Sequence, residues 1–118
     1  MNTVKIGAYG EALAAEYLKA LGYNIIKRNY RYRKSEIDII AWESETLVFL
    51  EVKSRSSEKY GCGAEAVNAR KQKMLVSGAY GFCSKNSLFE CKMRFDVLEV
   101  DLTLNKVVRH IENAFFAE

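Results

Sequence analysis

Two carboxylates and a lysine stand in two neighbouring apolar stretches of this chain. Residues 36–42 read Glu-Ile-Asp-Ile-Ile-Ala-Trp, and residues 46–55 read Thr-Leu-Val-Phe-Leu-Glu-Val-Lys-Ser-Arg. Side chains alternate along a strand, so Glu51, Lys53 and Arg55 continue the face of an otherwise apolar strand. An apolar face that turns charged while the strand continues breaks the expected pattern, and such breaks are typical of functional sites.

A hairpin between these two predicted strands brings the carboxylates together. If Trp42 pairs with Leu47, Asp38 lies directly opposite Glu51 on a common face. Cross-strand partners are about 5 Å apart at Cβ, which is close enough to share one ligand. Two carboxylates at that distance repel, whereas a divalent cation between them removes the repulsion. The pairing therefore predicts a site for Mg²⁺, which uses one or two carboxylates and fills its shell with water and phosphate oxygens.

Lys53 adds a cation beside the two carboxylates, and the same register places Glu36 opposite it. A lysine in this place can orient or activate an attacking water and offset the charge of a phosphoryl transition state. The alternative is a surface salt bridge between Lys53 and a neighbouring acid, which needs no function. The apolar setting of both strands favours the catalytic interpretation.

Two further charged side chains lie on the apolar sides of predicted helices. Lys71 falls on the apolar side of a helix predicted from residue 63 to about residue 84, where a lysine either extends to solvent or faces an anion. Glu11 shares a face with Ala14 and Leu18 in a helix predicted over residues 3–21. Its alternative is a solvated glutamate favoured by the helix dipole.

Residues 27–34 form a basic run in which five of the eight residues are lysine or arginine. Such a run attracts a phosphate backbone, and its tyrosines can stack on bases or sugars. A solvated edge strand, with charges that prevent aggregation, explains the run equally well. The candidate nucleic-acid contacts are Lys27, Arg28, Tyr30, Arg31, Tyr32, Arg33 and Lys34.

The composition indicates a single domain over residues 1–118, with 49% hydrophobic residues for a core and a net charge of +3. No apolar run approaches the roughly 20 residues that span a bilayer, and no export signal is evident, so we expect a cytoplasmic protein without membrane contact. Cys62, Cys83 and Cys91 have no C-x-x-C spacing, and His110 is the only histidine. We expect free thiols, so a metal would be held by oxygen ligands.

The hydrophobic periodicity predicts seven elements in the order α-β-β-β-α-β-β, which implies an α/β fold: a mixed central sheet flanked by two long helices. The helices are expected over residues 3–21 and 63–84, and the strands over residues 23–32, 36–42, 46–55, 92–100 and 106–112.

Several short motifs occur in order along the chain. They are Gly10-Glu11, Arg28-Asn29, Glu36-Ile37-Asp38-Ile39-Ile40-Ala41, Phe49-Leu50-Glu51-Val52-Lys53-Ser54-Arg55, Lys71-Gln72, Arg94-Phe95-Asp96-Val97 and Ile111-Glu112-Asn113-Ala114-Phe115. This combination resembles the bacterial YraN-like family of uncharacterised proteins. That family in turn is similar to the restriction-endonuclease-like superfamily, whose core motif is PD-(D/E)-x-K, and especially to archaeal Holliday junction resolvases.

The resemblance implies roles for residues already singled out and adds one more. Asp38 and Glu51 match the two metal carboxylates, and Lys53 matches the catalytic lysine. Glu11 matches a helix glutamate that completes the catalytic site, and Lys71 or Gln72 matches a polar helix position facing it.

Two positions depart from the pattern of the resemblance. Ile37 stands where the superfamily motif has proline, and Ser35 stands where the family usually has glycine. Neither change removes a ligand, although Ser35 affects how the chain enters the strand.

Two functions from different classes are consistent with these residues. The first is a Mg²⁺- or Mn²⁺-dependent deoxyribonuclease, an endonuclease acting on branched or damaged DNA. The second is a non-catalytic module that binds DNA or another nucleic acid through a nuclease-like fold. The first is preferred because every core position carries the residue type that the chemistry needs. The sequence leaves open whether the protein forms a homodimer.

Overall fold

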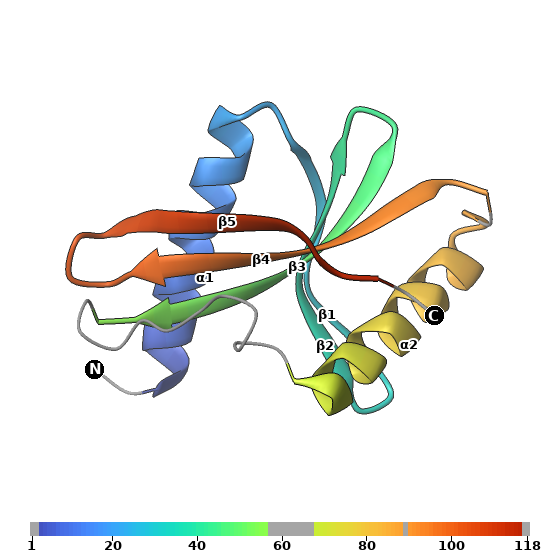
Figure 1. Ribbon diagram of the computed structural model, residues 1–118, viewed down its shortest axis with the longest axis horizontal. Helices are drawn as coiled ribbons and strands as arrows, with labels where there is room; N and C mark the ends of the chain where they lie inside the picture. The colour runs from blue at the N-terminus through green and yellow to red at the C-terminus, as the bar shows by residue number, and fades with distance from the viewer. Residues whose placement is uncertain (1–2, 57–67, 89, 117–118) are drawn as a thin grey trace.

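Five strands form one mixed sheet whose spatial order, β1-β2-β3-β4-β5, is also their order along the chain (Figure 1). The computed structural model describes residues 3–56, 68–88 and 90–116. All neighbouring strands are antiparallel except β3 and β4, which run parallel and are joined through α2. The elements are α1 (Thr3–Ala20), β1 (Asn24–Tyr32), β2 (Ser35–Glu43), β3 (Thr46–Arg55), α2 (Ala69–Lys85), β4 (Lys92–Asp101) and β5 (Lys106–Phe115).

The mixed α/β sheet with two helices, predicted from the sequence, is confirmed. The last strand extends to Phe115, beyond the predicted end at residue 112. The second helix begins at Ala69, capped by the Asn68 side chain, which accepts a hydrogen bond from the Lys71 amide. The earlier part of that predicted helix, residues 63–67, lies outside the described residues, as does Cys62. Among the described residues, no helix has the length and hydropathy to span a membrane.

Each helix packs against its own face of the sheet. Phe82 of α2 lies in one buried cluster with Phe49 and Phe95. Leu18 of α1 lies in a second cluster with Leu50 and Leu98. Phe49 and Leu50 are consecutive, so the alternation of a strand divides them between the two clusters. The middle of the sheet is therefore covered on both sides.

Two glycines allow α2 to approach the β1–β2 hairpin closely. A Cβ at Gly78 would lie 2.7 Å from the Ser35 hydroxyl, and one at Gly81 would lie 2.5 Å from the Tyr32 ring. Glycine inside a helix costs about 1 kcal/mol relative to alanine, and here the close packing offsets that cost. The Tyr30 ring packs edge-on against Phe82 with centroids 5.2 Å apart. Tyr30 is therefore partly buried and packs against the core through its ring, while its predicted stacking on bases stays a prediction.

Asp96 is the centre of a buried polar network between β4 and β5. Arg94 donates two hydrogen bonds to its carboxylate, each 2.9 Å long, and His110 Nε2 lies 2.8 Å from Oδ2. The amide of Asn113, a residue at φ +52° where β5 is irregular, donates a fourth bond of 3.1 Å. These bonds account for the Arg94-Phe95-Asp96-Val97 motif as a structural element.

This network predicts an acid-sensitive stability. Burial alone would raise the pKa of Asp96, but hydrogen bonds from His110, Arg94 and the Asn113 amide outweigh it and hold the pKa below its ordinary value of 3.8. Because the folded pKa is depressed, the stabilisation is present above the unfolded pKa and is lost as pH falls through the folded pKa. Asp96→Asn should lower the free energy of unfolding by about 3 kcal/mol near neutral pH.

Urea unfolding of both proteins, from about pH 6 down to about pH 2, measures this effect. The difference between wild type and Asp96→Asn should shrink below about pH 4. A difference that stays constant over that range would contradict an ionised Asp96 as its source.

Candidate active site where β2 and β3 separate

The β2–β3 hairpin has the predicted register and ends where the acidic residues begin. Trp42 pairs with Leu47, and the ladder continues to Ile39 opposite Leu50. Asp38 is not part of the ladder. Its Oδ2 atom instead accepts a hydrogen bond of 2.8 Å from the backbone amide of Val52. Beyond this point β2 pairs with β1, and β3 pairs with β4.

Glu51 lies at the centre of the site, and its side chain is only 6% exposed. Its Oε1 atom is 3.6 Å from Nζ of Lys53 on the same strand and 3.5 Å from Nζ of Lys71 on α2. Its Oε2 atom is buried and has no hydrogen-bond partner among the residues that the structure describes. The two oxygens of Glu51 therefore differ: one attracts two ammonium groups, and the other has no hydrogen-bond partner in the described part of the chain.

Asp38 is buried close enough to Glu51 for the two charges to interact. Burial raises the pKa of Asp38 to about 7, and the negative charge of Glu51 adds to this effect. The Val52 amide opposes the shift by stabilising the carboxylate, Glu11 raises the pKa, and Lys71 lowers it. Lys53 lies beside Glu51 as the sequence predicts. The predicted direct pairing of Asp38 with Glu51 is absent from the ladder, which ends at Ile39 and Leu50, and the two carboxylates are linked by the interaction of their charges.

Glu11 reaches the same region from α1. Burial raises its pKa, the Arg28 charge opposes the shift, and the charges of Glu36 and Glu51 add to it. Glu11 also lines a surface cavity of about 440 Å³ together with Arg28 and Arg31. The Glu11 charge raises the pKa of Asp38, and the Glu51 charge raises the pKa of Glu11, so Glu11 lies at the border of the site.

Gly10 determines how closely α1 approaches this border. A Cβ at Gly10 would lie 1.8 Å from the Ser54 hydroxyl oxygen and 2.9 Å from the Ser54 Cβ, so a larger residue requires the Ser54 side chain or the helix to shift. The close approach of α1 to β3 favours glycine at this position.

The extended hairpin register predicts Glu36 opposite Lys53, but the structure places Glu36 elsewhere. It pairs with Arg31 of β1 and forms an ion pair with it at 3.1 Å. The prediction is wrong because β2 leaves β3 after Ile39, so the cross-strand pattern no longer applies beyond that residue.

The other supporting residues lie at the edges. Arg55, at the end of β3, accepts a hydrogen bond from the Leu102 amide through its backbone carbonyl. Gln72 lines a surface groove with Phe116 and Tyr80, while Lys71, its neighbour, contacts Glu51. Lys71, one of the two α2 residues predicted to border the acidic site, therefore reaches it.

The basic run of residues 27–34 divides between two surfaces. Arg28 and Arg31 border the cavity beside Glu11. Arg33 and Lys34 line a separate hollow against α2, and the Arg33 guanidinium lies 5.2 Å from the centre of the Tyr32 ring. Lys27 is exposed next to an irregularity of β1.

The donors that could hold a metal are the two carboxylates of Asp38 and Glu51. Within the described part of the chain, no three Asp, Glu, His or Cys side chains come together as a metal-binding group. A pair of carboxylates is sufficient for Mg²⁺ or Mn²⁺ when water and phosphate complete the shell, and it is too few for a cage built from protein alone.

Comparison with known proteins gives the family of the chain. The family model described as "Uncharacterised protein family UPF0102" matches residues 10–100. The chain belongs to this family. A UPF0102 protein of Alkaliphilus oremlandii is 49% identical over 114 residues, covering 94% of this chain and 97% of that protein. One from Clostridioides difficile is 44% identical over 115 residues and covers 98% and 100% of the two chains.

Among solved structures, "The structure of Pyrococcus Furiosus SfsA in complex with Ca2+" matches with a TM-score of 0.34 and 16% identity. The match covers 90% of this chain and 61% of that one. An overlap of this quality bears neither on the fold nor on the function of the UPF0102 chain.

Two features of this UPF0102 protein were missed by sequence reasoning. Asp96 and His110 form a buried pair, for which the signals were the Arg94-Phe95-Asp96-Val97 motif and the charged residues inside the apolar stretch of β4. The groove shared by Tyr80 and Phe116 had no signal, because the two residues come from α2 and the end of β5.

The close approach at Gly10 gives a prediction with a matched control. Gly10→Ala should lower the free energy of unfolding by about 1–3 kcal/mol, because the added methyl overlaps Ser54. Gly7→Ala lies on the same helix, where a Cβ meets nothing within 4 Å, and it should leave stability unchanged or raise it. Urea unfolding compares the two variants, and equal stabilities would contradict the close contact.

Proposed function

We propose that this protein is a metal-dependent nuclease of the restriction-endonuclease-like type, which hydrolyses phosphodiester bonds in DNA. The observation that carries the proposal is the Glu51 carboxylate, buried between Lys53 and Lys71 with a second oxygen that has no partner among the described residues. A buried carboxylate oxygen without a partner is costly, so its presence favours a ligand at that atom.

Mg²⁺ or Mn²⁺ fits the donor set. Asp38 and Glu51 would hold the cation, since both are buried carboxylates whose charges repel without one. When bound, such a cation supplies Lewis-acid polarisation of a phosphoryl oxygen. The two carboxylates offer hard oxygen donors, which match the preference of these two metals.

The two lysines have complementary tasks in this proposal. Lys53 follows Glu51 on the same face of β3, and its Nζ is the cation placed to orient a water or a phosphate oxygen beside the carboxylates. Lys71 reaches the site from α2 and offsets the negative charge that a phosphodiester adds there. Glu51 positions both ammonium groups through one oxygen.

A non-catalytic nucleic-acid-binding module is the second candidate. It is favoured by one observation: Lys53 and Lys71 already balance the charge of Glu51, so the buried carboxylate forms a three-residue ion-pair network without a metal. In that case the basic side chains around the site would bind phosphates, and no bond would be cleaved.

Metal-induced stabilisation tests whether Asp38 and Glu51 bind the cation. Mn²⁺ should raise the melting temperature of the wild-type protein, because a ligand bound only to the folded state stabilises it. The Asp38→Asn/Glu51→Gln variant should show no such rise. Glu45→Gln removes an exposed carboxylate in the hairpin turn and should respond as the wild type does. Equal shifts in all three proteins would rule out the proposed ligands.

Cleavage of labelled duplex and branched DNA in Mg²⁺ or Mn²⁺ tests the chemistry. Lys53→Ala should lower the cleavage rate by about 100-fold or more, the usual loss when one group that stabilises transition-state charge is removed. Asp38→Asn/Glu51→Gln should abolish cleavage and leave DNA binding intact. A wild-type protein that binds these DNAs and cleaves none of them, with either metal, would favour the binding module instead.

A further inference from the structure

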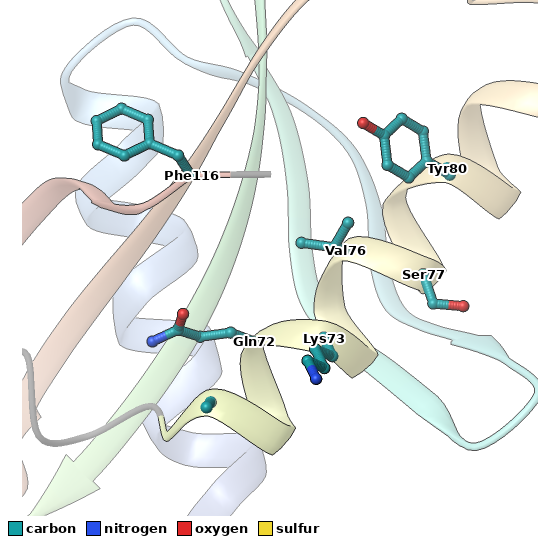
Figure 2. A pocket seen from close by; sticks show the side chains of 7 residues that line it. Gln72, Lys73, Val76, Ser77, Tyr80 and Phe116 are labelled. Carbon is teal, nitrogen blue, oxygen red and sulfur yellow. The ribbon is translucent and has the colours of Figure 1, made fainter. Parts of the chain in front are cut away.

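The outer side of α2 carries a groove that the acidic site does not use. Its first part, about 560 Å³ in volume, is lined by Gln72, Lys73, Val76 and Tyr80 of α2 and by Phe116 beyond the end of β5 (Figure 2). A second hollow of about 370 Å³ adjoins it, because Lys73 and Ser77 line both. Tyr32, Arg33 and Lys34 lie on the far side of the second hollow.

Two aromatic rings stand exposed on this groove. Tyr80 is 53% exposed and Phe116 is 75% exposed, although both are large and apolar. Figure 2 shows Val76 between them, with Tyr80 projecting from the helix and Phe116 from the strand end. Exposed aromatic rings that border one hollow are typical of a binding surface for a flat, partly apolar group.

The charges around the groove are all of one sign. Lys73, Arg33 and Lys34 are the charged residues that line the two hollows within the described part of the chain. The sequence of α2 contains no acidic residue between Ala69 and Lys85. An occupant of this groove should therefore combine negative charge with flat rings.

Unpaired nucleotides have both properties. A single strand presents base faces for stacking on aromatic side chains and phosphates for lysine and arginine, whereas the bases of a duplex are stacked on one another. The helix rises about 1.5 Å per residue, so Gln72 to Tyr80 spans about 12 Å, room for roughly three nucleotides stacked at about 3.4 Å each. An acidic peptide satisfies the charge but not the two exposed rings.

We infer that this groove binds a short single-stranded segment of DNA beside the acidic site, so that the preferred substrate is DNA with an unpaired strand. The inference rests on the proposed function and names its substrate class. Gln72 lines the groove, and Lys71 contacts Glu51 at 3.5 Å, so consecutive residues of α2 connect the two sites. A DNA strand that lies in the groove therefore emerges from it close to the carboxylates of the acidic site.

Fluorescence anisotropy with a labelled oligothymidine of about 12 nucleotides, in EDTA, tests the inference without cleavage. The Tyr80→Ala/Phe116→Ala variant should bind it about 10-fold or more weakly, because each stacked base depends on a ring. The single variant Tyr80→Phe keeps both rings and should bind oligothymidine as the wild type does. Tyr9→Ala removes another exposed ring, on α1, and should bind as the wild type does.

Two further measurements identify the chemistry. An abasic oligomer of the same length and charge should bind the wild-type protein about as weakly as oligothymidine binds the double variant. Lys73→Ala should neutralise one phosphate fewer, so the slope of log affinity against log salt concentration should become shallower by about one. If a polyglutamate peptide displaces oligothymidine and is itself bound 10-fold more weakly by the double variant, the groove is a protein-docking site and the inference is overturned.

The failure of this inference is distinguishable from failure of the proposed function. If the double variant binds oligothymidine as the wild type does while the wild type cleaves DNA in Mn²⁺, the groove assignment is wrong and the nuclease stands. If binding depends on the two rings but no DNA is cleaved, the groove assignment stands and the nuclease proposal is wrong.

Discussion

The separation of β2 from β3 is the constraint on which the site depends. The two strands pair from Glu43 and Thr46 to Ile39 and Leu50, and then each keeps only its other neighbour. A continuous ladder would use the Val52 amide for a backbone bond and leave Asp38 facing a closed sheet. Because the ladder stops, that amide donates its hydrogen bond to the Asp38 carboxylate instead. The opening between the strands is thus both the space for the acidic side chains and the source of their first hydrogen-bond donor.

Burying two carboxylates in this opening is unfavourable, and the surrounding elements supply the compensation. Desolvation and mutual repulsion raise the pKa of Asp38 to about 7. Lys53 comes from the strand that carries Glu51, whereas Lys71 must be brought from α2. The close packing at Gly78 and Gly81 keeps α2 near the β1–β2 hairpin, so helix packing and charge compensation are coupled. By contrast, the Asp96 network satisfies its carboxylate fully, whereas Glu51 keeps one buried oxygen without a hydrogen-bond partner among the described residues.

Local patterns predicted what depends on local geometry. The alternation of β3 placed Glu51 and Lys53 on one face, the turn length set the pairing of Trp42 with Leu47, and helix periodicity pointed Lys71 inward. The same alternation failed at Glu36, since a register extends only as far as the ladder does. It also could not show that Tyr30 packs on Phe82, because that contact depends on α2, which follows β1 by many residues. Long-range contacts of this kind leave little trace in a single sequence.

The arrangement of α2 explains how one helix can serve two surfaces. Successive residues of an α-helix are separated by about 100°, so Lys71 and Gln72 necessarily point in different directions from the same turn. One is directed to Glu51 and the other to the groove that Phe116 borders. The helix is anchored to the sheet by Leu75, Ala79 and Phe82, so neither surface can move without the other. Sites supported by a packed helix keep their separation better than sites on loops. A strand that occupied the groove would therefore meet the carboxylates at a distance set by the core itself.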